Sequence, residues 1–98
     1  MIIQIKKFGT TLTSRDSGRE AYKVLLSIIS NISNKEDIIL DFEGVNTFSP
    51  SWGDEVVVTL IKSKPNKVIL ANTTNKSVIE TFNLLAEISN IQFNFQTN

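Results

Sequence analysis

The chain has 98 residues, of which 41% are apolar and 20% charged, and its ten basic and ten acidic side chains cancel. This length suits one domain, residues 1–98, and the balanced charge argues against nucleic acid as the main partner. Cysteine and histidine are absent. Their absence excludes disulfides, thiol chemistry, and the most frequent general base and metal ligand. We expect no metal and no cofactor.

The N-terminal segment also argues against export. Its charges at Lys6 and Lys7 follow a short apolar run, which is the reverse of the order in a secretory signal. No apolar stretch in the chain approaches the roughly 18 residues that span a bilayer. We therefore expect a cytoplasmic protein without a membrane segment.

The first part of the chain predicts two short strands and the start of a helix. The β-branched and aromatic residues at positions 2–8 are typical of a strand, and residues 10–13 predict a short second strand that returns beside it. Ser17 and Glu20 have the spacing of a capping box, which makes Ser17 one candidate cap for the next helix. Ser14 is the alternative.

The clearest helix follows from hydrophobic periodicity. Apolar residues recur at intervals of three and four and predict an amphipathic helix from about Asp16 to Ile32. They are Ala21, Val24, Leu25, Ile28, Ile29 and Ile32. The polar residues 33–37 then indicate a loop. The nearly continuous apolar run Ile38–Phe42 is typical of a strand that is buried on both faces.

The segment after Pro50 supports two interpretations. Residues 55–61 are β-branched enough for a strand. Ser51 and Asp54 instead have N-cap spacing, and Asp54 and Glu55 would place negative charge in a first helical turn, where it is favourable. A four-residue repeat also favours a helix, and it consists of Trp52, Val56 and Leu60. Because parallel neighbouring strands need a crossover connection, we predict a helix.

The last third repeats the same alternation. Residues 67–71 predict a buried strand, and residues 72–75 predict a capping loop. An amphipathic helix follows, indicated by Val78, Ile79, Phe82, Leu85 and Ala86. Alternating apolar residues at positions 91–95 predict a half-exposed final strand at a sheet edge. The whole pattern predicts an α/β fold with a sheet of four to five mostly parallel strands and helices packed on it.

Two segments carry a family resemblance. Residues 39–45 read Ile-Leu-Asp-Phe-Glu-Gly-Val, and residues 48–55 read Phe-Ser-Pro-Ser-Trp-Gly-Asp-Glu. This strand, turn and helix start resemble the bacterial STAS-like domains of unknown function, and residues 12–15 with Gly18 look like the start of that family's first helix. The resemblance covers essentially the whole chain and implies the STAS fold.

The chain is more distantly similar to the STAS domains of anti-sigma factor antagonists and of sulfate-transporter tails. That similarity implies a non-enzymatic, protein-binding signalling module whose partner is a histidine-kinase-type ATPase or an anti-sigma-like regulator. The antagonists usually carry Asp-Ser-Ser-Gly in this turn, with one phosphorylated serine. Here Ser51 aligns best with the phosphoacceptor and Ser49 is the runner-up, whereas Pro50 and Trp52 depart from the pattern.

The residues themselves leave the role of this turn open. A helix N-terminus at Ser51 would favour an oxyanion, and Ser14 and Arg15 would lie at the same edge of a parallel sheet. Arg15 would then bind a phosphate or carboxylate. The alternative is that Ser51 is only an N-cap and Arg15 is solvated or paired with Asp54. The anion-binding interpretation also allows a second function, the binding of a small molecule or anion such as a nucleotide or phosphate.

Two further positions have a structural and a functional interpretation. Trp52, with Pro50 beside it, would either close the core or anchor a partner, and the four-residue repeat of Trp52 favours the core. Asp41 at a strand end would be catalytic in an α/β enzyme, alone or with Asp54, Glu55 and Mg²⁺. Without histidine or cysteine nearby, a structural hydrogen bond from Asp41 to loop backbone is the better interpretation. We expect no enzyme.

Overall fold

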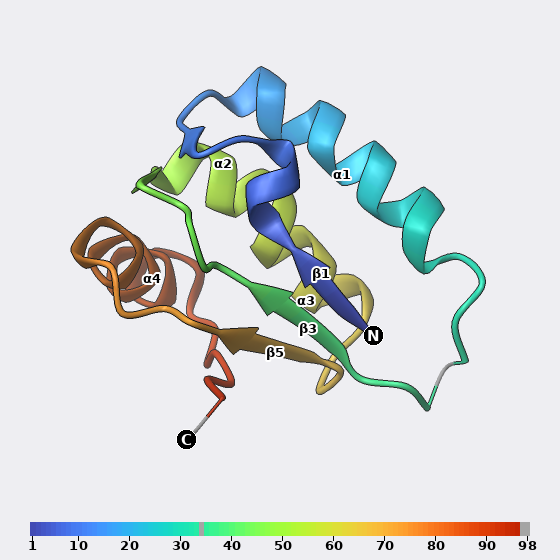
Figure 1. Cartoon of the computed structure of the whole chain (residues 1–98). Helices are drawn as coiled ribbons and strands as arrows, with labels where there is room; N and C mark the ends of the chain where they lie inside the picture. The colour runs from blue at the N-terminus through green and yellow to red at the C-terminus, as the bar shows by residue number, and fades with distance from the viewer. Residues whose placement is uncertain (34, 97–98) are drawn as a thin grey trace.

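The computed structural model describes residues 1–33 and 35–96, and it contains both strands and helices, as predicted (Figure 1). The first predicted strand is shorter than expected, because residues 5–8 form a 3-10 helix. The strands are β1 (Ile2–Gln4), β2 (Thr11–Leu12), β3 (Ile38–Asp41), β4 (Thr47–Phe48) and β5 (Val68–Ala71). The helices are η1 (Ile5–Phe8), α1 (Arg15–Ile29), α2 (Pro50–Gly53), η2 (Asp54–Val58), α3 (Thr59–Ser63) and α4 (Lys76–Ser89). Within the described residues, none of the helices has both the length and the apolar character that crossing a bilayer requires.

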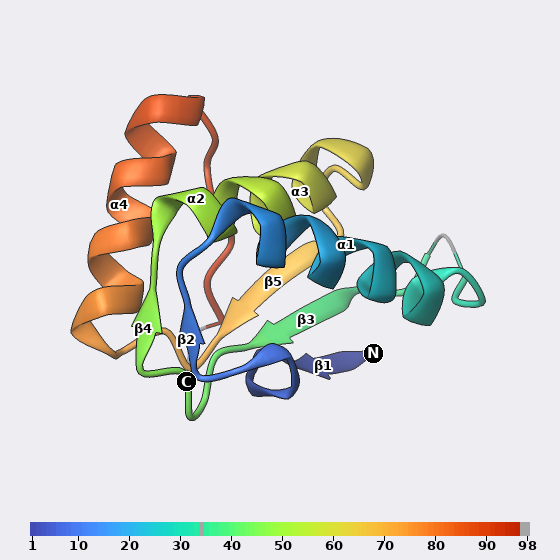
Figure 2. The ribbon, with the colours of Figure 1, turned by 90° about the horizontal axis from the view of Figure 1, so that it is seen from above.

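The main sheet consists of three parallel strands in the order β1-β3-β5. Ile3, Leu40 and Leu70 stand opposite one another in the register and are buried. They belong to one core cluster with Leu25 of α1, Trp52 of α2 and Leu60 of α3. These three helices lie together over one face of the sheet (Figure 2). This arrangement makes the fold α/β with a parallel sheet, as the alternation of elements predicts.

The predicted number of strands is wrong. The main sheet has three strands instead of four to five, and a separate two-stranded sheet pairs β2 with β4 in parallel. The second strand was expected beside β1, but Thr11 lies opposite Thr47 and Leu12 opposite Phe48. The 3-10 helix η1 and Gly9 turn the chain away from β1 between the two strands. Gly9 has a φ of 130°, a conformation that favours glycine.

The predicted final strand is reduced to one isolated bridge. Phe95 pairs with Leu70 of β5, and the Leu70 N–H donates to the Asn94 carbonyl at 2.8 Å. The apolar alternation that predicts a strand reflects packing on α4 instead. The Phe93 ring lies edge-on to Phe82, with the ring centroids 5.1 Å apart.

Residues 50–63 are helical, as the crossover argument predicts. The helix starts at Pro50, widens into the π-helical turn η2 and continues as α3. The Thr59 hydroxyl donates to the Asp54 carbonyl across this turn at 3.0 Å. The side chains of the four-residue repeat are fully buried, and they are Trp52, Val56 and Leu60. The helix therefore carries the largest side chain of the core.

The backbone of α2 at Gly53 packs closely against side chains from α4 and β4. A Cβ atom at Gly53 would lie 2.7 Å from Leu85 Cδ1 and 2.9 Å from Phe48 Cζ, so only glycine fits without a shift. The Phe48 ring packs against Phe82 of α4, with the centroids 5.1 Å apart. Helix α4 thus holds the β4–α2 turn from one side, while α1 holds it from the other (Figure 2).

Candidate functional site

The turn from β4 into α2 is capped by Ser49. Its Oγ accepts a hydrogen bond from the Trp52 N–H at 3.4 Å, and Pro50 occupies the first helical position. The sequence-based interpretation of Ser51 as the N-cap is therefore wrong by two positions. The physical reason lies in Pro50, because proline lacks an N–H and suits the first helical position, which leaves the residue before it as the cap.

The start of α1 lies directly beside this turn. Ser14 caps α1 by accepting the Ser17 N–H at 3.0 Å, which selects Ser14 over Ser17 as the cap. The Ser49 hydroxyl donates to the Thr13 carbonyl at 2.8 Å, and the Ser49 N–H donates to the Leu12 carbonyl at 2.9 Å. Ser49 therefore caps α2 and also connects it, through hydrogen bonds, to the segment that leads into α1.

An ionic cluster joins the two helix starts. Arg15 Nη1 lies 2.9 Å from Asp54 Oδ2 and 2.9 Å from Glu55 Oε1. Arg19, one turn further along α1, places its Nε 3.5 Å from the same Glu55 oxygen and pairs with Asp16 at 2.9 Å. The hydrogen bonds to Asp54 and Glu55 raise the pKa of Arg15 above its ordinary value. Arg15 is thus held in its charged form at the surface.

Trp52 lies beneath the cluster. Its side chain is fully buried, and its Nε1 donates to the Ser17 hydroxyl at 3.1 Å. A Cβ atom at Gly18 of α1 would lie 3.3 Å from the Trp52 Cα and 3.0 Å from the Glu55 Cβ. Trp52 therefore belongs to the core, as its spacing predicts. It offers no surface to a partner in this conformation.

The two candidate phosphoacceptors have different surroundings. The Ser49 hydroxyl already donates to Thr13 and accepts from Trp52. Ser51 is half-buried in the first turn of α2, three and four residues before Asp54 and Glu55. Those carboxylates are paired with arginine, which reduces the repulsion that they would exert on a phosphate at Ser51.

The geometry disfavours a free anion at Arg15. Its guanidinium already contacts two carboxylates, so an added anion would meet negative charge at short range. Asp41 lies apart from the cluster and accepts the Glu43 N–H at 2.9 Å and the Asn72 side-chain N–H at 2.7 Å. The loop hydrogen bond predicted for Asp41 is confirmed. Among the described residues, no group of three or more acidic side chains is arranged to hold a metal ion.

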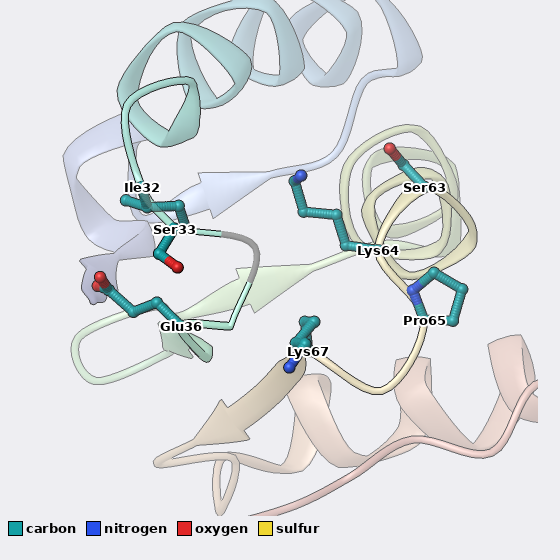
Figure 3. Close-up of a pocket in the computed structure, with 7 residues that line it drawn as sticks. All are labelled: Ile32, Ser33, Glu36, Ser63, Lys64, Pro65 and Lys67. Carbon is teal, nitrogen blue, oxygen red and sulfur yellow. The ribbon is translucent and has the colours of Figure 1, made fainter.

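A hollow lies at the opposite end of the sheet, near the amino ends of β3 and β5 (Figure 3). It has a volume of about 240 Å³, and Glu36, Lys64 and Lys67 border it. Charges of both signs meet there, and every buried side-chain polar atom in the described part of the chain has a hydrogen-bond partner. Nothing in this hollow selects one class of ligand.

Sequence reasoning found Ser14, Arg15, Asp54 and Glu55 but missed two contributors. Arg19 appears in the sequence as part of a solvated helix face, although its four-residue spacing from Arg15 places both arginines on one face of α1. Ser17 appears as a possible cap, whereas its hydroxyl accepts the Trp52 indole N–H. Only the packing of α1 on α2 shows either role.

Comparison with known families places part of the chain. A family model described as a STAS-like domain of unknown function matches residues 20–78, which include β3, β4, α2, η2, α3 and β5. No curated protein and no solved structure matched the chain.

Proposed function

Because the chain belongs to the family of STAS-like domains of unknown function, we propose that it is a non-enzymatic regulatory module that binds a protein partner. The partner is a histidine-kinase-type ATPase or an anti-sigma-like regulator, as in the antagonists that the sequence resembles. The recognition surface is the ionic cluster at the starts of α1 and α2. The observation that carries the proposal is the contact of Arg15 with both Asp54 and Glu55 at an exposed position.

The cluster contributes more to recognition than to stability. The side chains of Arg15 and Asp54 are 45% and 43% exposed, and exposed ion pairs add little to the free energy of unfolding. The capping hydroxyls, Gly18 and Trp52 already fix the two helices against each other beneath these charges. The result is a rigid, charged surface whose arrangement is set before a partner arrives, which lowers the cost of binding.

Ser51 is the proposed regulatory position. A phosphate there would carry a charge of about −1.5 to −2 in the first turn of α2, where the helix dipole favours it. It would compete with Asp54 and Glu55 for Arg15 and so rearrange the same surface. Ser49 is the poorer acceptor, because its hydroxyl holds the cap and the Thr13 carbonyl.

A capture experiment tests the binding surface. The chain would be used to isolate partners from its native host, with mass spectrometry as the readout. We expect one ATPase or regulator to bind the wild-type chain and to be lost with Arg15→Glu. The matched control is Lys62→Glu, a charge reversal at an exposed position on α3. Equal capture by both variants would reject the cluster as the recognition surface.

Intact-mass measurement of the protein from its host tests the modification. We expect a phosphate adduct that disappears with Ser51→Ala and persists with Ser49→Ala. Partner affinity should change with Ser51→Asp. An unmodified mass during active signalling would contradict regulation at Ser51 but would leave the binding surface intact. A thermal-shift response to nucleotide or phosphate would instead support the alternative function, the binding of a small anion.

A further inference from the structure

The outer edge of β4 is completed by side chains of α4. Among the described residues, β4 has a strand neighbour on one edge only, where it pairs with β2. Helix α4 lies beside the other edge (Figure 2). There the Ser77 hydroxyl accepts the Phe48 N–H at 3.0 Å and donates to the Phe48 carbonyl at 3.3 Å. Thr81 Oγ1 donates to the same carbonyl. Two hydroxyls thus take the place of a second neighbouring strand.

These two hydroxyls are fixed in position by α4 itself. Asn75 caps the helix by accepting the N–H groups of Ser77 at 2.8 Å and of Val78 at 3.3 Å, which holds Ser77 in the first turn. Ser77 is half-buried and Thr81 is 6% exposed. Water therefore cannot readily replace either hydroxyl, and a buried backbone group of Phe48 that lost its partner would be costly to leave unpaired.

The residues that follow Phe48 form the turn into α2. Ser49 caps α2, and Ser51 lies in its first turn. On the side of α1, the Ser49 hydroxyl holds the turn by donating to the Thr13 carbonyl at 2.8 Å. On the side of α4, the two hydroxyls hold Phe48, whose ring also packs on Phe82 with the centroids 5.1 Å apart. Because β4 is only two residues long, it has few backbone bonds of its own, and these side-chain contacts decide whether the turn stays closed.

Access to Ser51 depends on this turn. Ser51 is half-buried in α2, which packs between α1 and α4. A kinase transfers the γ-phosphoryl group of a nucleoside triphosphate to a hydroxyl oxygen, which loses its proton, and it has to place that hydroxyl in line with the transferred group. A hydroxyl that is half-buried in a packed helical turn reaches such an active site only when the turn opens locally. Opening on the side of α4 requires the bonds of Phe48 to Ser77 and Thr81 to break.

We propose that Ser77 and Thr81 form a latch on the β4–α2 turn, and that opening of this latch controls the access of a modifying enzyme to Ser51. With the latch closed, α4 keeps the turn packed. With the latch open, β4 separates from α4 while the main sheet stays folded. The role of Ser51 rests on the proposed function, whereas the latch itself rests on the contacts of α4 with Phe48.

Amide hydrogen exchange of the ¹⁵N-labelled chain measures the opening. Thr81→Val keeps the shape of the side chain and removes its hydrogen bond to β4. We expect the amides of Ser49 and Trp52, which donate to groups outside α4, to exchange about tenfold faster or more in this variant. The amides of Leu40 and Leu70 in the main sheet should exchange within about twofold of the wild-type rate, because the opening is local.

Three further variants sharpen the experiment. Ser77→Ala removes the other half of the latch and should give the same pattern as Thr81→Val. Thr81→Ser restores the hydroxyl and should exchange at the wild-type rate. Asn83→Ala, at an exposed position on α4, is the matched control and should leave the exchange of the turn unchanged.

Two exchange results would overturn the latch. The first is unchanged exchange at Ser49 and Trp52 in both latch variants, which would show that the turn stays closed without the hydroxyls. The second is equal acceleration at Leu40 and Leu70, because the hydroxyls would then stabilise the whole domain instead of the turn.

Intact-mass measurement of the chain from its native host tests the control of access. The Thr81→Val chain should carry more phosphate at Ser51 than the wild-type chain. Equal phosphate in the two chains would overturn the control of access. An absence of phosphate from every chain would reject Ser51 as the regulatory position, and the exchange rates would still decide whether the latch exists.

Discussion

The two ends of α1 meet different surroundings. At its start, Ser14 and Gly18 lie against the α2 turn, and the backbones approach so closely that an added Cβ at Gly18 would sit 3.0 Å from Glu55. Toward its end, Val24 and Ile28 project over the free edge of β1 and are about half exposed. The same helix is thus closed at one end and open at the other.

This difference separates stability from recognition. At the closed end, buried side chains and caps determine the position of α1, so the exposed charges above them add little to folding. At the open end, the apolar side chains contribute little to the core, and β1 has a neighbouring strand on one side only among the described residues. We therefore expect buried substitutions at the closed end to lower the free energy of unfolding strongly, and substitutions at the open end to lower it little.

The largest expected effect is at the core of the closed end. Trp52→Ala should lower the free energy of unfolding by about 3–5 kcal/mol, because it leaves a cavity under the two helix starts. Ile28→Ala at the open end should cost less than about 1 kcal/mol, since the side chain is already 42% exposed. Urea unfolding of both variants measures the contrast. Similar losses would contradict the division of α1 into two regions.

Gly18→Ala should have the next largest effect. Alanine gains about 1 kcal/mol of helix propensity over glycine, but its Cβ would press on the Trp52 backbone and on Glu55. We expect a net loss of about 1–2 kcal/mol from the shift of α1 away from α2. Ser27→Ala, at an exposed position on the same helix, serves as the control. A Gly18→Ala variant more stable than wild type would show that this contact is looser than described.

Ser49→Ala tests the cap. It removes the bond to the Trp52 N–H and the bond to the Thr13 carbonyl, and loss of such a cap costs about 1 kcal/mol. Ser51→Ala should change the free energy of unfolding by less than about 0.5 kcal/mol, because Ser51 is not the cap. Thermal unfolding of the pair measures the difference. The reverse order would restore Ser51 as the N-cap.

Arg15→Ala should have the smallest effect on stability. Its small shift in the unfolding midpoint should disappear near about 1 M salt, where charges are screened within about 3 Å. The pKa of Arg15 is raised in the folded chain, so its contribution is fully present below the ordinary pKa and is lost only as pH rises through the higher, folded value. The effect should therefore stay constant from about pH 6 to about pH 10, a range that lies below the ordinary pKa of arginine. A shift that persists at high salt would indicate a packing role for the arginine.

The long helices and buried strands could be predicted from the sequence because their apolar periodicity is strong. The helix over residues 50–63 needed a topological argument, since its β-branched residues also suit a strand. The sequence could not predict that β2 pairs with β4, because two-residue strands have no periodicity and the contact between them is nonlocal. At the C-terminus, an alternating pattern reflected packing of Phe93 on Phe82 instead of a ladder.

The candidate site could be predicted in composition but not in detail. The spacing of serines and acids located the two helix starts, yet several hydroxyls were eligible as caps, and only the geometry assigns Ser14 and Ser49. The pairing of Arg15 with Asp54 was one of three alternatives open from sequence, beside a solvated arginine and an anion-binding one. The contribution of Arg19 depends on the angle between α1 and α2, which no local pattern specifies.

The most direct test of the central claim is a charge exchange within the cluster. The double variant Arg15→Glu with Asp54→Arg keeps opposite charges on the two helix starts but reverses their order at the surface. If this surface recognises the partner, the double variant should unfold near the wild-type midpoint and capture no partner. Wild-type capture by the folded double variant would contradict the claim and place recognition elsewhere on the domain.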